Sequence, residues 1–182
     1  MNKKILAVID VQNDFIDGSL RNEEAIKKVP NIVKKIKDFD GDAIIYTLDT
    51  HDTDYLKSRE GKLLPVEHCI RDTEGWNLNK DVEEAINDAQ ERGVAIYAVA
   101  KPTFGDLAFA EAIDDFTHGE DFELEFVGFC TDICVVSNVL IAKAVFYDTA
   151  DIAVDSSCCA GVTPEKHEAA LETMRSCQIN VK

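Results

Sequence analysis

Short apolar runs alternate with segments of helical periodicity along most of this chain. The apolar runs are typical of strands, which we expect at Ile5–Val11, Asp42–Leu48, Val94–Lys101, Phe122–Cys130, Asp151–Ser156 and Ile179–Val181. Runs such as ILAVI and VAIYAVA are apolar at almost every position, as in strands of a parallel sheet that is covered on both faces. The pattern therefore predicts a sheet buried between two layers of helices.

The intervening segments place apolar residues three and four positions apart, as one face of a helix requires. We expect helices at Glu23–Phe39, Asp81–Arg92, Asp106–Phe116, Thr131–Tyr147 and Pro164–Cys177. Pro30 lies inside the first of these and predicts a break or kink, because proline lacks the N–H that a helix interior uses. The alternation predicts the α/β class: a three-layer α/β/α sandwich with a mainly parallel, six-stranded, Rossmann-like sheet.

Residues 50–80 interrupt this alternation with a long segment of little periodicity that contains His51, His68 and Trp76. Long irregular segments inside compact domains are usually functional or disordered. The apolar residues of this segment argue for order, and we expect Trp76 to pin it to the body of the fold.

Composition and charge limit the classes of partner. The formal net charge is -16, and a surface this acidic repels phosphate backbones and anionic lipids, so we expect neither a nucleic-acid nor a membrane partner. The apolar stretch Ile5–Ile9 is too short for a secretory signal, which favours a cytoplasmic protein. In that compartment the cysteines default to free thiols.

Ionisable side chains follow four of the expected strands, at the sheet edge where ligands bind in open α/β folds. Asp10, Lys101 and Cys134 are therefore expected to meet in one site. A helix N-terminus and a nearby ammonium both favour the thiolate form of Cys134. Asp10 could accept the thiol proton and later donate it to a leaving group. Each residue alone is more often structural, and the joint placement carries the prediction.

The pair Cys130 and Cys134 leaves three interpretations open on spacing alone: a disulfide, two metal ligands, or a nucleophile and a bystander. In the third case the backbone N–H groups from Cys130 to Cys134 could hold an oxyanion.

The segments VIDVQNDF, AVAKPTFG and GFCTDICV resemble, in this order, the aspartate, lysine and nucleophile motifs of the isochorismatase-like cysteine hydrolases. This superfamily contains nicotinamidases, isochorismatases and N-carbamoylsarcosine amidases. The resemblance covers nearly the whole chain, so we expect residues 1–182 to form a single hydrolase domain, with residues 50–80 as a metal and substrate loop. It implies that Cys134 is the nucleophile, that Asp10 is the general base and acid, and that Lys101 stabilises the thiolate.

The resemblance also distinguishes the two cysteines. It implies a cis peptide bond between Phe129 and Cys130 and an oxyanion hole formed by the backbone N–H groups of Cys130 and Cys134. The thiol of Cys130 is then incidental.

Oxygen and imidazole donors in the long segment are ligands that zinc accepts, although such residues on a polar loop are more often simply solvated. The DTHD stretch and the later His68–Cys69 pair resemble nicotinamidase metal motifs, which implies a site of Asp49, His51 and His68. Where many nicotinamidases have a further histidine, this chain has Lys57 and Ser58. Some relatives use a glutamate there, and the resemblance thus makes Glu60 the candidate fourth ligand. Such a set suits a divalent metal, zinc first, with iron or manganese as alternatives.

Phe15, Leu20 and Phe104 follow the aspartate and lysine motifs and are candidates to wall a pocket for an aromatic ring, with ordinary core packing as the alternative. The expected activity is a cysteine-dependent amidohydrolase acting on a small-molecule amide, first of all nicotinamide. Alternatives are hydrolysis of isochorismate or of an N-carbamoyl amine, and a non-catalytic metal-binding or interaction protein with the same fold. Relatives are commonly homo-oligomers, and we expect the same here.

Overall fold

A six-stranded parallel sheet forms the middle of the molecule, in a computed structural model that describes residues 2–182. Its strand order is β3-β2-β1-β4-β5-β6. The strands are β1 (Lys3–Ile9), β2 (Ala43–Asp49), β3 (Ala95–Lys101), β4 (Phe122–Phe129), β5 (Ala150–Ala160) and β6 (Asn180–Val181). Every pair of neighbouring strands is parallel, which confirms the predicted fold class.

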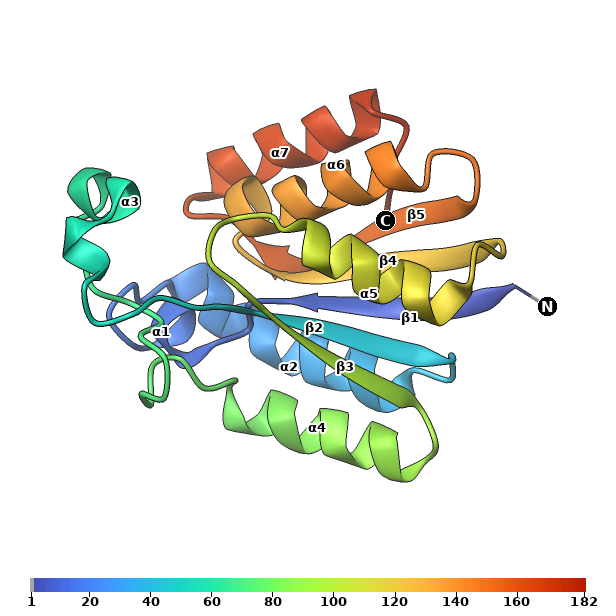
Figure 1. Cartoon of the computed structure of the whole chain (residues 1–182), viewed down its shortest axis with the longest axis horizontal. Helices are drawn as coiled ribbons and strands as arrows, with labels where there is room; N and C mark the ends of the chain where they lie inside the picture. Colours follow the sequence, from blue (N-terminus) through green and yellow to red (C-terminus); the bar gives the residue numbers. More distant parts are fainter. Residues whose placement is uncertain (1) are drawn as a thin grey trace.

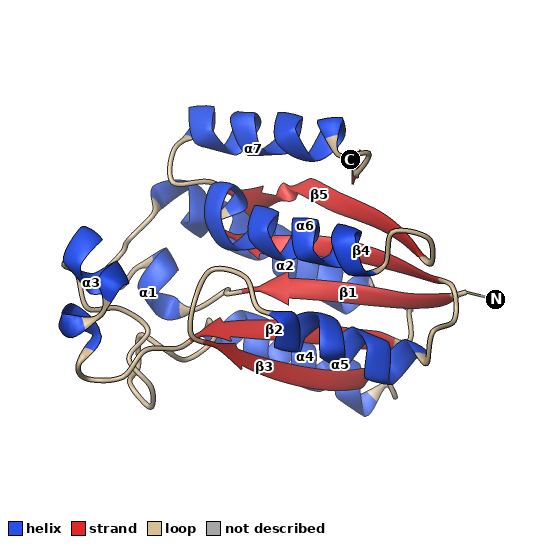
Figure 2. Cartoon of the chain, turned by 45° about the horizontal axis from the view of Figure 1, so that its top comes forward, coloured by secondary structure: helices blue, strands red, loops and turns tan. Residues whose placement is uncertain are grey.

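Helices cover both faces of this sheet (Figures 1 and 2). The helical elements are α1 (Asn13–Ile16), α2 (Glu23–Asp38), η1 (Tyr55–Lys57), α3 (Arg59–Leu63), α4 (Lys80–Glu91), α5 (Leu107–Thr117), η2 (Thr131–Val135), α6 (Val136–Val145) and α7 (Pro164–Ser176). Helices α2 and α4 pack on one face of the sheet, and α5, α6 and α7 pack on the other. Within residues 2–182, no helix has the length and apolar character that crossing a membrane requires.

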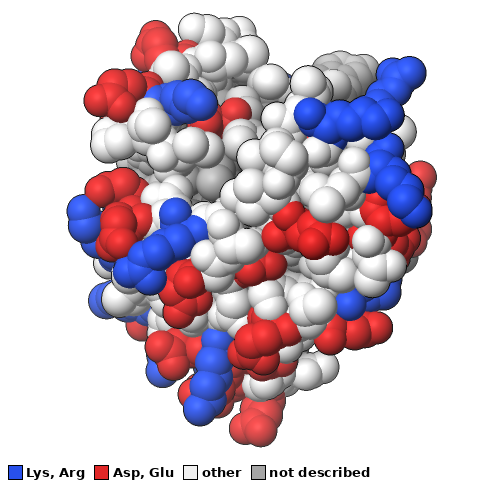
Figure 3. Space-filling model, turned by 90° about the vertical axis from the view of Figure 1, so that its left-hand side faces the viewer, with Lys and Arg blue, Asp and Glu red and all other residues white. Residues whose placement is uncertain are grey.

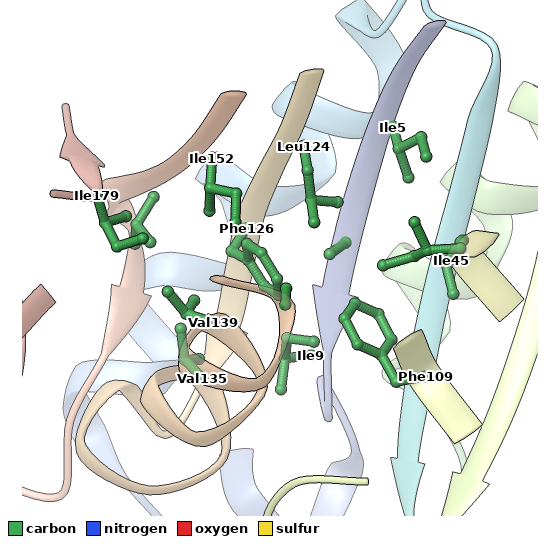
Figure 4. Close-up of a cluster of buried hydrophobic side chains, with 14 of the residues drawn as sticks. Ile5, Ile9, Ile45, Phe109, Leu124, Phe126, Val135, Val139, Ile152 and Ile179 are labelled. Carbon is green, nitrogen blue, oxygen red and sulfur yellow. The ribbon is translucent and has the colours of Figure 1, made fainter. Parts of the chain in front are cut away.

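Two apolar clusters, one on each face, explain why the strands are hydrophobic at nearly every position. Successive residues of β1 point to opposite faces, so that Ile5 and Ile9 join the cluster of α5 and α6, whereas Leu6 and Val8 join that of α2 and α4. Figure 4 shows the first cluster, where Phe109 of α5 and Val139 of α6 face the side chains of β1 and β4. The sheet is thus buried on both faces, as the sequence pattern predicted.

The predicted break at Pro30 is wrong, because α2 runs without interruption from Glu23 to Asp38. Pro30 lies on the exposed side of the helix, while Val29 and Ile32 on the other side are buried in the apolar cluster. Proline removes one internal hydrogen bond, and the packing of the buried face keeps the helix together across that position.

The carboxyl ends of the strands lie at one edge of the sheet. The direction in which successive strands are added to the sheet changes between β1 and β4. Strands β2 and β3 follow β1 in one direction, and β4, β5 and β6 follow it in the other. Such a switch point is where open α/β sheets bind their ligands. Residues 50–80 lie at this edge and contain η1 and α3, and Figure 1 shows α3 beyond the ends of the strands.

Gly128 lets β1 and β4 approach each other closely beside this switch point. Its φ is +122°, and a Cβ atom built there would lie 2.1 Å from the carbonyl oxygen of Ile9. Gly128 and Ile9 are direct partners in the ladder between the two strands. Only glycine adopts this backbone conformation without strain and leaves room for the neighbouring strand.

Candidate active site

Asp10, Lys101 and Cys134 come together at the carboxyl edge of the sheet. The Lys101 ammonium lies 2.6 Å from Asp10 Oδ2 and 3.7 Å from Cys134 Sγ. Asp10 directly follows β1, Lys101 ends β3, and Cys134 lies in η2 after β4. The three residues, which are distant in sequence, thus form one buried cluster, as the sequence analysis predicted.

The neighbours of Asp10 fix its carboxyl group in place. The Thr47 hydroxyl of β2 donates a hydrogen bond to Asp10 Oδ1 at 2.6 Å. The same hydroxyl accepts a hydrogen bond from the Asp10 N–H at 3.2 Å. One carboxyl oxygen therefore pairs with Thr47 and the other with Lys101. The φ of Asp10 is +47°, which turns the chain sharply at the end of β1.

Burial determines the protonation of this cluster. The pKa of Asp10 is raised because burial disfavours its charged form more than the Lys101 ammonium favours it. Burial alone would lower the pKa of Lys101, but Asp10, Cys134 and Asp49 outweigh it and raise the pKa, so the ammonium keeps its charge.

The sequence analysis named the helix N-terminus and Lys101 as groups that favour the thiolate form of Cys134, and in the folded protein burial opposes them. The pKa of Cys134 is raised well above its ordinary value, first by burial and then by the negative charge of Asp10, and Lys101 only partly compensates. The sulfur therefore carries its proton at neutral pH, and Asp10 is the nearby base that can remove it.

The turn that carries Cys134 is a single π-helical turn leading into α6. The peptide bond between Phe129 and Cys130 is cis, as the resemblance implied. Asn138, one turn after Cys134 and fully buried, donates hydrogen bonds to the carbonyl oxygens of Cys134 at 2.8 Å and Phe104 at 3.0 Å. Asn138 thus ties the turn that carries Cys134 to the loop after β3, a contact that the sequence analysis missed.

All six cysteines are free thiols in the described residues, which excludes a disulfide between Cys130 and Cys134 there. Burial raises the pKa of Cys130 to about 12, so its thiol is protonated at neutral pH.

Asp49, His51 and His68 form a second buried cluster beside the first. Each offers one donor atom, and these atoms all lie within 4.8 Å of one another. Asp49 Oδ2 lies 3.1 Å from His51 Nε2 and 3.5 Å from His68 Nε2. The structure thus brings together three of the four predicted ligands.

This donor set fits a divalent cation. The Val66 carbonyl accepts a hydrogen bond from His68 Nδ1 at 2.8 Å, so Nε2, which faces Asp49, is the atom that can donate to this carboxylate without a cation and would offer its lone pair to a cation once deprotonated. Asp49 Oδ1 is a buried oxygen without a hydrogen-bond partner among the described residues. Burial raises the pKa of Asp49, but the hydrogen bonds from His51 and His68 and the Lys101 charge outweigh this and lower it, so the carboxylate is ionised. Two imidazoles and a carboxylate are a common set for zinc.

Glu60, the fourth predicted ligand, lies at the rim of this cluster, in the first turn of α3. Its Oε1 is 3.7 Å from His51 Nε2 and 3.8 Å from His68 Nε2. The Ser58 hydroxyl caps α3 by accepting a hydrogen bond from the Gly61 N–H at 2.9 Å, and this places Glu60 towards the two imidazoles.

One cleft with a volume of about 790 Å³ joins the two clusters. Cys130 and Cys134 of the first cluster line it together with Asp49, His68 and Glu60 of the second. The three predicted wall residues all line it as well: Phe15, Leu20 and Phe104. Further apolar lining comes from Leu64, Ile133 and Val162, which the sequence analysis did not identify. On the face that carries this edge, acidic and basic side chains surround a band of uncharged atoms (Figure 3).

The chain resembles known proteins over nearly its whole length. A family model described as an isochorismatase domain matches residues 4–181. An isochorismatase family protein of Bacillus subtilis (strain 168), PncA, is 30% identical over 145 residues, which is 77% of this chain and 78% of that protein.

Solved structures give the same result. The crystal structure of nicotinamidase/pyrazinamidase PncA from Bacillus subtilis has a TM-score of 0.83 at 28% identity, with 98% of both chains covered. The fold is also shared by the pyrazinamidase of Pyrococcus horikoshii in complex with zinc, with a TM-score of 0.73 and 24% identity over 99% of this chain and 98% of that one.

Proposed function

Because this chain belongs to the isochorismatase family, we propose that it is a cysteine-dependent nicotinamidase, which hydrolyses nicotinamide to nicotinate and ammonia. One observation carries the proposal: the Cys134 thiol and the Asp49–His68 cluster line the same apolar-walled cleft. A thiol with its own base supports attack on a carboxamide, and a cation site beside it suits a substrate whose ring carries a lone pair. The structural relative from Bacillus subtilis at 28% identity is a nicotinamidase.

In the first half of the proposed reaction, Cys134 becomes acylated. Asp10 takes the thiol proton as sulfur bonds to the carboxamide carbon, and the oxyanion that forms accepts hydrogen bonds from the backbone N–H groups of Cys130 and Cys134. Asp10 then gives that proton to the amide nitrogen, and the C–N bond breaks. Ammonia departs, and the acyl group remains bound to Cys134 as a thioester.

In the second half, the thioester is hydrolysed. Asp10 removes a proton from water as its oxygen bonds to the thioester carbon, and the same two N–H groups hold the oxyanion. The C–S bond then breaks, and the proton passes from Asp10 back to sulfur. The acid that is released gives its remaining water-derived proton to solvent and leaves as nicotinate. The raised pKa of Asp10 suits this shuttle, since a base works best when its pKa approaches the working pH.

Lys101 remains charged throughout and balances the negative charge that moves between Asp10 and Cys134. Its ammonium contacts both groups, and its hydrogen bond to the Thr103 carbonyl at 3.1 Å holds it between them. Its proposed role is thus electrostatic, and no proton transfer from it is needed.

Asp49, His51 and His68 would hold the divalent metal, zinc first, with Glu60 at the rim. When bound there, the metal supplies a Lewis-acid anchor for the ring nitrogen of nicotinamide. Phe15, Leu20 and Phe104 would pack against the ring and keep water away from it.

An ammonia-release assay with purified protein tests the proposal. Nicotinamide, pyrazinamide and an N-carbamoyl amine are compared as substrates, and isochorismate cleavage is measured in a separate assay. The Cys134→Ala variant serves as the control. We expect release from nicotinamide by the wild type and none by the variant. Preferred turnover of the carbamoyl amine or of isochorismate would assign another reaction of this family, and no turnover of any of them would favour a non-catalytic protein.

The expected cytoplasmic location and homo-oligomeric state belong to the same proposal. Fractionation of the source cells tests the first, and light scattering of the eluting protein during gel filtration tests the second.

A further inference from the structure

The segment that follows β1 contacts both clusters of the cleft with alternate residues. Asp10 faces Lys101, whereas Gln12 and Asp14 reach the backbone of the segments that carry Asp49 and His68. We infer that Gln12 and Asp14 are positioning residues, which fix the metal ligands relative to Asp10 and thereby set the metal affinity. This inference rests on the metal site of the proposed function and goes beyond it.

Gln12 holds Asp49 through the backbone of that residue. Its Oε1 accepts a hydrogen bond from the Asp49 N–H at 2.8 Å, and its Nε2 donates to the Asp49 carbonyl at 2.9 Å. The second proton of Nε2 goes to the Trp76 carbonyl at 2.8 Å. Gln12 is fully buried, so these bonds are shielded from water. Its side-chain amide bonds the N–H and the carbonyl of Asp49 as the backbone of a neighbouring strand would, and so holds Asp49 at the end of β2.

Asp14 holds the turn that carries His68. Its Oδ2 accepts a hydrogen bond from the Cys69 N–H at 2.7 Å, and its Oδ1 accepts one from the Ser19 N–H at 2.9 Å. Cys69 has a φ of +46°, which few non-glycine residues adopt, and the bond to Asp14 supports this conformation. The Asp14 carboxylate packs closely on Gly75, where an added Cβ would lie 2.2 Å from Oδ2.

The same turn also reaches His51. The Cys69 carbonyl accepts a hydrogen bond from the His51 N–H at 3.0 Å. Asp14 therefore supports Cys69, the residue that follows His68, and Cys69 in turn anchors the backbone of His51. Outer residues of this kind commonly alter metal affinity when changed, because they orient the ligands without touching the ion.

Two variants test the inference, each with a matched control on the same segment. Gln12→Met removes the three side-chain hydrogen bonds at similar volume, and Asp14→Asn replaces one acceptor oxygen by a donor. Asn13→Ala is the control for a lost contact, because the Asn13 amide bonds the Glu74 carbonyl of the same long segment at 2.8 Å, away from the ligands. Asp17→Asn is the control for lost charge, since Asp17 is exposed at the end of α1.

Zinc affinity is measured by competition with a chromophoric chelator, and the rise in unfolding temperature on adding zinc is measured in parallel. The rise on adding zinc separates weaker binding from a general loss of stability. We expect Gln12→Met and Asp14→Asn each to raise the zinc Kd by about 10- to 100-fold, and the two controls to change it little. The rate of Cys134 alkylation by iodoacetamide should stay within about twofold of wild type in all four variants, because their bonds are on the metal side of the cleft.

The outcomes separate this inference from the proposed function. Unchanged zinc affinity in both variants, in a wild type that binds zinc and hydrolyses nicotinamide, overturns the inference alone. Reduced affinity in a wild type that binds zinc but hydrolyses no nicotinamide supports the inference and overturns the activity. A wild type that binds no divalent metal overturns the inference together with the metal site, and ammonia release then decides the activity by itself. If Gln12→Met does not fold, Asp14→Asn decides the result.

Discussion

The ammonium of Lys101 lies 2.6 Å from the carboxylate of Asp10, and both side chains are inaccessible to solvent. The two residues lie at the ends of strands that are separated by β2 in the sheet. A buried ion pair of this kind contributes little net stability compared with an apolar pair, yet losing one partner leaves an uncompensated charge. The pair is thus better explained by the chemistry of Cys134 than by stability.

Replacing Lys101 by methionine tests this relationship. We expect Lys101→Met to reduce the free energy of unfolding by about 3–5 kcal/mol, because Asp10 loses its partner, and to abolish hydrolysis. The double variant Lys101→Met with Asp10→Asn should be more stable than the sum of the single changes predicts. Urea denaturation of the four proteins measures this, and strict additivity would show that the two groups do not interact.

The two cysteines of the nucleophile turn should respond differently to alanine. Cys134→Ala removes the attacking sulfur, and we expect activity to fall by at least about 10³-fold while the zinc content stays unchanged. Cys130→Ala keeps the backbone N–H and should retain activity within about tenfold. Ammonia release and metal analysis measure both effects, and loss of zinc from Cys134→Ala would argue against separate thiol and metal clusters.

The protonation state of Cys134 can be read from the pH dependence of its alkylation. Because burial and Asp10 raise the pKa of Cys134 above its ordinary value, the thiolate fraction should increase about tenfold per pH unit from pH 7 to 9, without a plateau. Iodoacetamide labelling, followed by mass spectrometry of the peptide, measures the rate, with Cys134→Ala as background. A plateau below pH 8 would show that the resting sulfur is a thiolate.

A second charge cluster, far from the cleft, predicts a loss of stability in acid. The Lys35 ammonium lies 3.0 Å from Glu125 and 2.7 Å from Asp155, and joins α2 to β4 and β5. Burial alone would raise the pKa of both carboxyls. The hydrogen bonds from Lys182 and Lys35 outweigh burial at Glu125, so the pKa of Glu125 is lowered. The hydrogen bonds from Lys35 and Ser157 likewise outweigh burial at Asp155 and lower its pKa.

A carboxyl whose pKa is lowered by folding stabilises the protein above its ordinary pKa, and this contribution is lost as the pH falls through the lowered value. Between pH 7 and pH 3, wild type should therefore lose about 1 kcal/mol more of its unfolding free energy than Lys35→Met does. Lys34→Met is the control, because Lys34 pairs with Asp38 on the exposed side of the same helix. Equal acid sensitivity of wild type and Lys35→Met would contradict the prediction.

The fold and the three-residue cluster were predictable because both follow from rules that act along the chain. Continuous apolar runs require a sheet covered on both faces, and parallel strands bring their carboxyl ends to one edge. Asp10, Lys101 and Cys134 each stand at such an end, so topology alone brings them together.

The supporting contacts were not predictable in the same way. Gln12 and Asn138 are polar residues with partners in other elements, and nothing in their own neighbourhood in sequence identifies those partners. The resting state of Cys134 was not predictable for a related reason: the helix terminus and Lys101 were visible in the sequence, whereas the burial that opposes them depends on the packed structure.

The close approach of β1 and β4 at Gly128 also limits how this enzyme can diverge. Any other amino acid there would push apart the two strands that lead to Asp10 and Cys134. Substrate preference can change through the cleft walls one residue at a time, but position 128 accepts no other amino acid without strain. In a library randomised over the whole chain and selected for ammonia release, this position should therefore remain glycine even when the walls have been replaced.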